Sequence, residues 1–246
     1  MWSTLLVLGA SVGWADPLNE AITAFNTMSH YDIPALTGEQ RAQLRQGGVV
    51  KFIDGGGDGL TTPKRSIAYV LTAAPRDDLW VSYLDVHFTQ ESTRYHLVQS
   101  QPPDRMTWYG YLDLPWPFDD RHWVTTSWNN HEISQATGGR MWEHPWQLEP
   151  DWRALVEPLV DGGQIPWMGR DVLDASIYLP KNSGAFVTIG LDDDQILMVY
   201  HSTSAIGGSV PEDAMLRYLL RTIDELVTQV DERARKVVPG HYTAGH

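Results

Sequence analysis

Near the N-terminus, apolar residues recur with helical spacing. Leu18, Ile22 and Phe25 indicate a short amphipathic helix. A second helix is expected in "TGEQRAQLR", where Thr37 and Gln40 have the spacing of a capping box. The segments "VVKFID" and "RSIAYVLTAA" then read as strands, and "PRDDLWVSYLD" reads as a helix that begins with a proline.

Between Tyr95 and Leu148 the pattern changes to a period closer to two. The segments "YHLVQS", "TWYGYLDL", "RHWVTTSW" and "RMWEHPWQL" are separated by polar and glycine clusters, which is typical of an antiparallel meander. A helical insertion at "PDWRALVEPLVDGG" and two strands, "GAFVTIG" and "QILMVYHS", follow. Apolar residues at every third or fourth position then predict a helix from Pro211 to about Lys236, roughly 40 Å long. We therefore expect an α+β fold.

Length and composition favour one globular domain. The chain has 246 residues, of which 42% are hydrophobic and 20% charged, and it contains no low-complexity linker. Its formal net charge of −13 argues against a nucleic-acid partner. The absence of cysteine excludes disulfides, thiol catalysis and thiolate metal sites.

The first fifteen residues, "MWSTLLVLGASVGWA", have the pattern of a secretory signal peptide. The apolar run from Leu5 to Val12 is too short to span a bilayer, and Gly13 and Ala15 are small residues where a signal peptidase reads the chain. We expect cleavage after Ala15 and a periplasmic or secreted protein, with an uncleaved apolar N-terminus as the alternative. The expected organisation is a signal peptide at 1–15, one domain at 16–236 and a disordered tail at 237–246.

Short motifs for catalysis and for phosphate or metal binding are incomplete. The cluster Gly55–Gly59 lacks the Gly-Lys-Ser/Thr of a phosphate loop, and a hairpin turn explains it better. "HEISQ" has Gln135 where a zinc-protease helix has its second histidine, and Asp192–Asp194 reads as a solvated turn. His201 and Ser202 are neighbours on a strand and face opposite sides. We expect no metal and no cofactor.

Tryptophan is concentrated in the strand-rich region. Eight of the eleven tryptophans lie between Trp108 and Trp167. Trp123 and Trp128 have opposite parity on one predicted strand, so some indoles must face away from the residues that others contact. Core packing and the lining of a cavity are both compatible with this distribution.

Two stretches of the chain resemble the StAR-related lipid transfer (START) family. "LPWPFDDRHWV" is similar to its Pro-Trp-Pro…Asp-Arg-Asp-Phe-Val segment, with His122 and Trp123 in place of the Asp and Phe. "GAFVTIGLDDDQILMVYHSTSAIGGSVPEDAM" is similar to its aromatic strand, hairpin, Tyr-ended strand, Gly-Gly-x-Ile-Pro and terminal helix. The resemblance extends from about Gly48 to Lys236. The family's Val-Arg is replaced by "LDASIYL", and the segment 149–170 is an insertion.

The resemblance implies a helix-grip fold of the Bet v 1-like (SRPBCC) superfamily, in which a curved antiparallel sheet wraps around a long C-terminal helix. It also implies an apolar cavity that binds and transfers one lipid, such as a sterol, a phospholipid or another hydrophobic molecule, without catalysis. Enclosing apolar surface is favourable by roughly 25 cal/mol per Å². The expected wall residues, each with a plain core position as its alternative, are Trp108, Tyr111, Trp123, Trp142, Phe186, Val199, His201, Met215, Tyr218 and Leu219.

Arg121 is the predicted contact for a polar head group. Its alternative role is a structural ion pair with Asp119 or another carboxylate. By the resemblance, the loop from Asp113 to Asp120 and the start of the terminal helix are the mobile parts that admit a ligand.

Gly207 and Gly208 are the predicted hinge of that lid. They precede Ser209 and Glu212, which have the spacing of a capping box and specify a firm helix start. A rigid helix on a permissive joint suits a cavity that must open.

The expected partners are a hydrophobic small molecule and, transiently, a membrane, and the expected state is a monomer. The alternative function is a cyclase- or aromatase-like enzyme of the same superfamily, with His201, His122 or Tyr200 transferring protons inside the cavity. A third possibility is a ligand sensor that acts on a protein partner.

Overall fold

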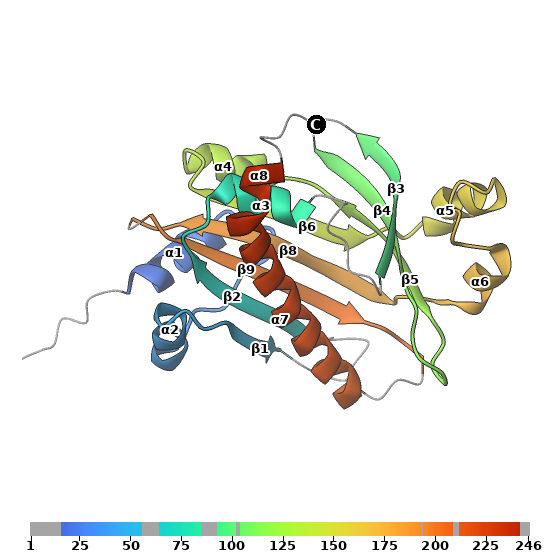
Figure 1. Cartoon of the computed structure of the whole chain (residues 1–246), viewed down its shortest axis with the longest axis horizontal. Helices are drawn as coiled ribbons and strands as arrows, with labels where there is room; N and C mark the ends of the chain where they lie inside the picture. The colour runs from blue at the N-terminus through green and yellow to red at the C-terminus, as the bar shows by residue number, and fades with distance from the viewer. Residues whose placement is uncertain are drawn as a thin grey trace, which may run out of the picture.

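The computed structural model describes residues 16–55, 64–84, 93–101, 104–192, 194–208 and 212–241. Within these ranges helices surround one sheet (Figure 1). The elements in chain order are α1 (Pro17–Asn26), α2 (Gly38–Arg45), β1 (Val50–Asp54), β2 (Arg65–Thr72), α3 (Arg76–Leu84), β3 (Thr93–Gln101), β4 (Arg105–Leu112), β5 (Arg121–Ser127), α4 (His131–Ala136), β6 (Met141–Leu148), α5 (Trp152–Asp161), α6 (Arg170–Ala175), β7 (Ile177–Tyr178), β8 (Lys181–Gly190), β9 (Ile196–Ala205), α7 (Glu212–Lys236) and α8 (Val238–His241).

The strands form one sheet in the order β1-β2-β9-β8-β6-β5-β4-β3, and all neighbours in this path are antiparallel. The short strand β7 pairs in parallel with β5. Strands β3 to β6 are consecutive neighbours, so the predicted meander is confirmed. The helix α7 crosses one face of the curved sheet diagonally (Figure 1). The predicted α+β helix-grip architecture is therefore confirmed.

The C-terminal half of α7 is fixed to its surroundings. Its apolar stripe of Ile223, Val227, Val230 and Ala234 is buried in one cluster with residues of α3, β2, β8 and β9. The hydroxyl of Ser82 in α3 donates to the Val230 carbonyl at 2.9 Å. This half of the helix follows the 3.6-residue period because it covers the sheet with a single face.

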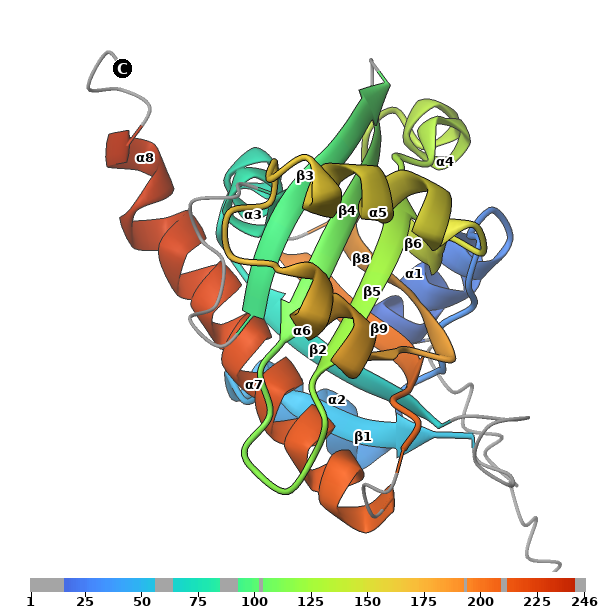
Figure 2. The same cartoon turned by 90° about the vertical axis from the view of Figure 1, so that its right-hand side faces the viewer.

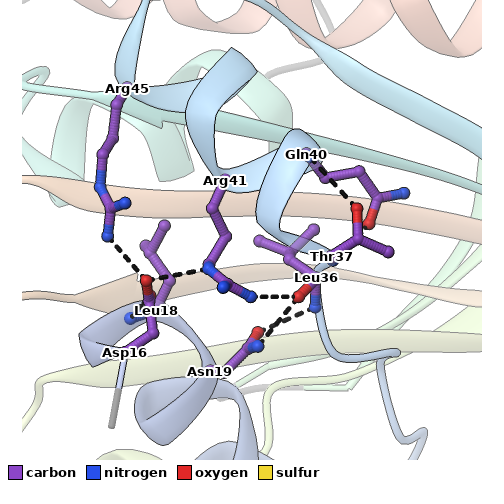
Figure 3. Close-up of polar contacts among 8 residues, drawn as sticks. All are labelled: Asp16, Leu18, Asn19, Leu36, Thr37, Gln40, Arg41 and Arg45. Atoms are coloured by element: carbon purple, nitrogen blue, oxygen red, sulfur yellow. Dashed lines mark hydrogen bonds and ion pairs between the residues drawn. The ribbon is translucent and has the colours of Figure 1, made fainter. Parts of the chain in front are cut away.

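Helices α1 and α2 cover the opposite face of the sheet and are tied to each other by polar contacts (Figure 3). The Asp16 side chain caps α1 through the Leu18 amide at 3.1 Å and pairs with Arg41 at 2.8 Å and Arg45 at 2.9 Å. The Asn19 side chain donates to and accepts from the Leu36 backbone. The predicted capping box of Thr37 and Gln40 is also confirmed.

The insertion predicted at 149–170 forms α5 and the segment leading to α6. Figure 2 shows these two helices lying across β4 and β5, on the side of the sheet away from α7. Val156 and Leu173 are buried there against Tyr109, Tyr111 and Val124. The insertion thus covers a sheet face that carries buried apolar side chains.

Part of the predicted disordered tail is ordered, which corrects the boundary at 237. Residues Val238–His241 form α8, and the Val238 side chain is buried because it is apolar and lies beside the end of α7. The signal peptide at 1–15, most of the turn at Gly55–Gly59, the cap residue Ser209 and the end of the tail at 242–246 lie outside the described residues.

Candidate functional site: a cavity under the C-terminal helix

A cavity of about 320 Å³ lies between α7 and the inner face of the sheet. Its walls come from α3, α7, strands β3 to β6, β8 and β9, and two loops. Tyr95 on β3 and Tyr218 on α7 line it and are also 41% and 38% exposed, so this side of the cavity reaches solvent. The lining residues are Tyr83, Leu84, Tyr95, Trp108, Leu112, Arg121, Trp123, Thr125, Ser127, His144, Trp146, Leu179, Asn182, Tyr200, Ser202, Ser204, Ile206, Tyr218, Leu219, Thr222, Leu226, Gln229, Val230 and Arg233.

Two indole rings lie flat against the sheet and form part of the cavity floor. A Cβ built on Gly110 of β4 would be 2.3 Å from the Trp123 ring, and one on Gly184 of β8 would be 2.5 Å from the Trp146 ring and closer still to the backbone oxygen of His201 on β9. Neither distance is possible for real atoms, so each indole occupies the space that a neighbouring side chain would fill. Glycine on the adjacent strand therefore lets each ring lie low and leaves room above it.

A short chain of polar groups crosses this floor from β6 to β9. Trp146 Nε1 donates to Asn182 Oδ1 at 3.2 Å, and the Ser204 hydroxyl donates to the same oxygen at 3.4 Å. The hydroxyls of Ser202 and Ser204 are 2.9 Å apart. We call Trp146, Asn182, Ser202 and Ser204 the polar relay; their side chains share one sheet face because their strands pair in register.

His144 is a neutral group of the wall. Burial lowers the pKa of His144 to about 4, so the imidazole is uncharged near neutral pH. Its Nδ1 lies 2.8 Å from Asn129 Oδ1, an acceptor, which assigns the proton to Nδ1 and leaves Nε2 as an acceptor.

Arg121 is 1% exposed and its guanidinium is committed to backbone carbonyls. Nε donates to Ile206 at 2.6 Å, Nη2 to Gly207 at 3.0 Å, and Nη1 to Asp119 and Asp120. Burial lowers the pKa of Arg121, and the charges of the two aspartates oppose that shift. The predicted side-chain ion pair with Asp119 is replaced by bonds to main-chain oxygens. Arg121 thus joins the start of β5 to the segment between β9 and α7.

Gly207 and Gly208 have backbone angles that favour glycine. Their φ values are +62° and +69°, and a Cβ on Gly208 would be 2.6 Å from Arg121 Nη2. The folded conformation by itself requires glycine at both positions, because other residues rarely adopt these angles. Their role as a hinge stays a prediction.

Several predicted wall residues do lie on the cavity. Trp108, Trp123, Tyr218 and Leu219 line it, and Arg121 lies at its edge. Met215 is on α7, but its side chain is outside the described residues. The structure brings the first four together because two come from neighbouring strands and two from the helix above them.

Tyr111, Val199 and His201 are not wall residues, which corrects the prediction for each. Tyr111 is buried beneath α5 and α6, and Val199 belongs to the cluster under α1 and α2. His201 contacts the Tyr31 ring, with centroids 5.7 Å apart, on that same outer face. The reason is strand parity, since a shift of one residue moves a side chain to the other face of the sheet.

Phe186 and Trp142 face the α7 side but lie beyond the cavity, under α3. The Phe186 ring stacks on Tyr83 with centroids 4.2 Å apart, and it is fully buried. Trp142 contacts the Trp80 ring at 5.0 Å. Both predictions as wall residues are wrong because α3 fills the space above them.

Tyr200, Ser202 and Ser204 are wall residues that the wall prediction missed. They alternate with Val199 and His201 along β9. The sequence "ILMVYHSTSA" shows that apolar side chains of this strand face both sides of the sheet, because successive residues alternate. It does not indicate which of the two sides faces the cavity.

The groups proposed for the enzymatic alternative are also separated. His122 is buried against Trp152 and Tyr178 on the outer face, and His201 lies on that face too. Tyr200 lines the cavity, and burial raises the pKa of its hydroxyl, which stays protonated. Within the described residues no cluster of His, Asp or Glu could hold a metal ion, and no helix is both long and apolar enough to cross a membrane.

No protein-family profile matches the sequence, and no curated protein matches it. Solved structures do match. A STAR-related lipid transfer protein from Xanthomonas axonopodis is 15% identical, with a TM-score of 0.57 over 77% of this chain and 94% of that one. The chain has the START fold.

Human proteins give the same result. STARD10 matches with a TM-score of 0.55 at 8% identity, over 88% of this chain and 87% of that one. The lipid transfer and protein localization domain of human StarD13 matches with 0.53 at 12% identity, over 83% of this chain and all of that one. At these identities the likeness establishes the START fold, and the function must be argued from the cavity.

Proposed function

We propose that the protein binds one lipid or other hydrophobic molecule in the cavity under α7 and carries it between membranes without catalysis. The observation that supports this most directly is the cavity itself, enclosed by the grip strands and α7 in a chain with the START fold. The structural neighbour from Xanthomonas axonopodis is named as a lipid transfer protein.

The cavity suits such a ligand physically. Aromatic and aliphatic side chains form most of its wall, and two indoles offer flat apolar surface. Removing apolar ligand surface from water contributes roughly 25 cal/mol per Å². Its volume of about 320 Å³ is at the lower end of the range for pockets that bind small molecules, about 300–1,000 Å³, which favours a compact ligand.

The direct test is the lipid content of the purified protein. We expect mass spectrometry of a solvent extract to find about one hydrophobic molecule per chain. Leu219→Trp should reduce that content severalfold, because the larger side chain of a wall residue fills the cavity. Arg221→Gln on the exposed side of α7 serves as the control. An empty protein that also fails to take up lipid from vesicles would contradict the proposal.

We also propose that the loop between β4 and β5 contacts the membrane. Trp116 in this loop is 92% exposed, and the loop begins and ends next to the wall residues Leu112 and Arg121. An indole with this exposure is suited to the membrane interface.

Trp116→Ser should therefore weaken association with phosphatidylcholine vesicles severalfold in a sedimentation assay. Unfolding should be unchanged, since the exposed ring contributes little to the fold. Equal sedimentation of the two proteins would contradict this contact.

The mature protein is proposed to be exported and to begin at Asp16. Asp16 caps α1 and pairs with Arg41 and Arg45, so this residue already belongs to the folded domain (Figure 3). The intact mass of the protein from a periplasmic fraction should correspond to residues 16–246. A mass that includes the first fifteen residues would refute cleavage.

A further inference from the structure

The polar relay is unusual in its position, because it lies on the floor of a mostly apolar cavity. Ser202 is 8% exposed, and among the described residues its hydroxyl forms a hydrogen bond only with Ser204. Polar groups buried in apolar surroundings are costly unless they form hydrogen bonds. A ligand group that completes these bonds would be favoured.

The hydrogen bonds within the relay show which group would fit. Asn182 Oδ1 accepts from both Trp146 and Ser204, so the Ser204 proton is used and Ser202 donates to Ser204. Ser202 Oγ is then left as an acceptor. The amide group of Asn182 donates no hydrogen bond to another described residue. An acceptor and a donor within one relay suit a hydroxyl, which can both donate and accept.

The charges around the cavity argue against an ionised ligand. Among the described residues its wall contains no carboxylate and two arginines, Arg121 and Arg233. Arg121 donates four hydrogen bonds to carbonyls of its own chain. Arg233 lies near the C-terminal end of α7, where its Nε donates to the Gln229 carbonyl. Neither arginine takes part in the relay, so an anion seated on it would be desolvated without a bonded cation.

We infer that the ligand is a compact, uncharged, largely apolar molecule whose hydroxyl group binds to Ser202 and Asn182 while its body lies on the indoles of Trp123 and Trp146. This inference rests on the proposed function and adds the chemical class of the ligand. Ser202 and Asn182 become the residues that determine specificity.

Three fluorescent probes of one shape test this inference: pyrenemethanol, methylpyrene and pyrenecarboxylate. Equilibrium titration of the full protein at pH 7 should show the alcohol binding about five- to tenfold more tightly than methylpyrene, which corresponds to one hydrogen bond. The carboxylate should bind more weakly than the alcohol by at least a similar factor.

The variant Ser202→Ala should reduce the ratio of alcohol to methylpyrene affinity to near one, while methylpyrene binds as before. Thr203→Val is the matched control, because Thr203 is the next residue on β9 and its side chain faces the other side of the sheet. The ratio is measured within each variant, so a change in stability does not imitate the effect.

Equal binding of the alcohol and methylpyrene by the unaltered protein would overturn the inference and leave the proposed function standing. Tighter binding of the carboxylate would do the same. An unchanged ratio in Ser202→Ala would also overturn it. Binding of none of the three probes, together with an empty solvent extract, would contradict the proposed function and this inference with it.

Discussion

Gly110 and Gly184 each lie beneath an indole ring of the adjacent strand, and this arrangement sets the height of the cavity floor. In the sequence both glycines look like weak points in otherwise regular strands. Their structural role depends on two tryptophans that lie next to them only because the strands pair. Gly110 is paired with Trp123, and Gly184 is paired with Trp146. A glycine within a strand often marks such a close approach, but its partner is known only when the register is known.

Replacing Gly110 by Ala should push the Trp123 ring up into the cavity. The three atoms nearest to the added Cβ all belong to that ring, so we expect the Trp123 side chain to move. We expect a destabilisation of about 1–3 kcal/mol, typical of overpacking, and a severalfold lower lipid content. Chemical denaturation and solvent extraction measure the two effects.

The double variant Gly110→Ala with Trp123→Leu is the control, because the smaller side chain removes the clash. It should recover part of the lost stability. Full lipid content in Gly110→Ala alone would show that the flat indole does not limit the cavity.

At the scale of elements, the two halves of α7 have different surroundings. Its C-terminal half is buried against α3, β2 and β9, whereas Tyr218, Leu219 and Thr222 nearer its start lie over the cavity. The segment that leads into this first half is held by Arg121. We expect opening of the cavity at this end to break those two hydrogen bonds.

Arg121→Lys should loosen the joint between β9 and α7. A single ammonium group cannot reach the carbonyls on both sides as the guanidinium does. We expect a loss of about 2 kcal/mol in the free energy of unfolding and faster hydrogen exchange in the peptide that contains Ile206 and Gly207. Arg221→Lys, on the exposed side of α7, is the matched control. Unchanged exchange would mean that Arg121 does not hold the joint.

At the scale of the whole molecule, three buried histidines make the fold sensitive to acid. Burial lowers the pKa to about 4 for His122 and His144 and to about 3 for His201. Both ring nitrogens of His201 are buried without a hydrogen bond to a described residue. The unfolded chain binds a proton at each histidine with a pKa of about 6.5.

The free energy of unfolding should therefore fall as the pH decreases from about 6.5 towards 4. In this window the unfolded state takes up protons that the folded state does not, and each histidine contributes up to about 1.4 kcal/mol per pH unit. His201→Leu should flatten the slope in urea denaturation and leave no hydrogen-bond partner unpaired. Identical slopes for both proteins would contradict this account.

The sequence determined the order of elements, the meander, the capped helix α2, the terminal helix and the likeness to the START fold. These depend on local periodicity, capping residues and glycine positions, which act over a few neighbouring residues. Trp108, Trp123, Tyr218 and Leu219 could be predicted on the wall because they lie in segments that the fold places around the cavity.

Only the tertiary structure decided which face of each strand meets the cavity. Along β9 the positions of Tyr200, Ser202 and Ser204 face it, and those of Val199 and His201 do not. Helices cover both faces of the sheet, so both faces bury side chains and the usual contrast between an apolar and a polar face is weak. The polar relay depends on residues far apart in the chain, which meet only when the strands pair. The same is true of the hydrogen bonds from Arg121 to the segment between β9 and α7.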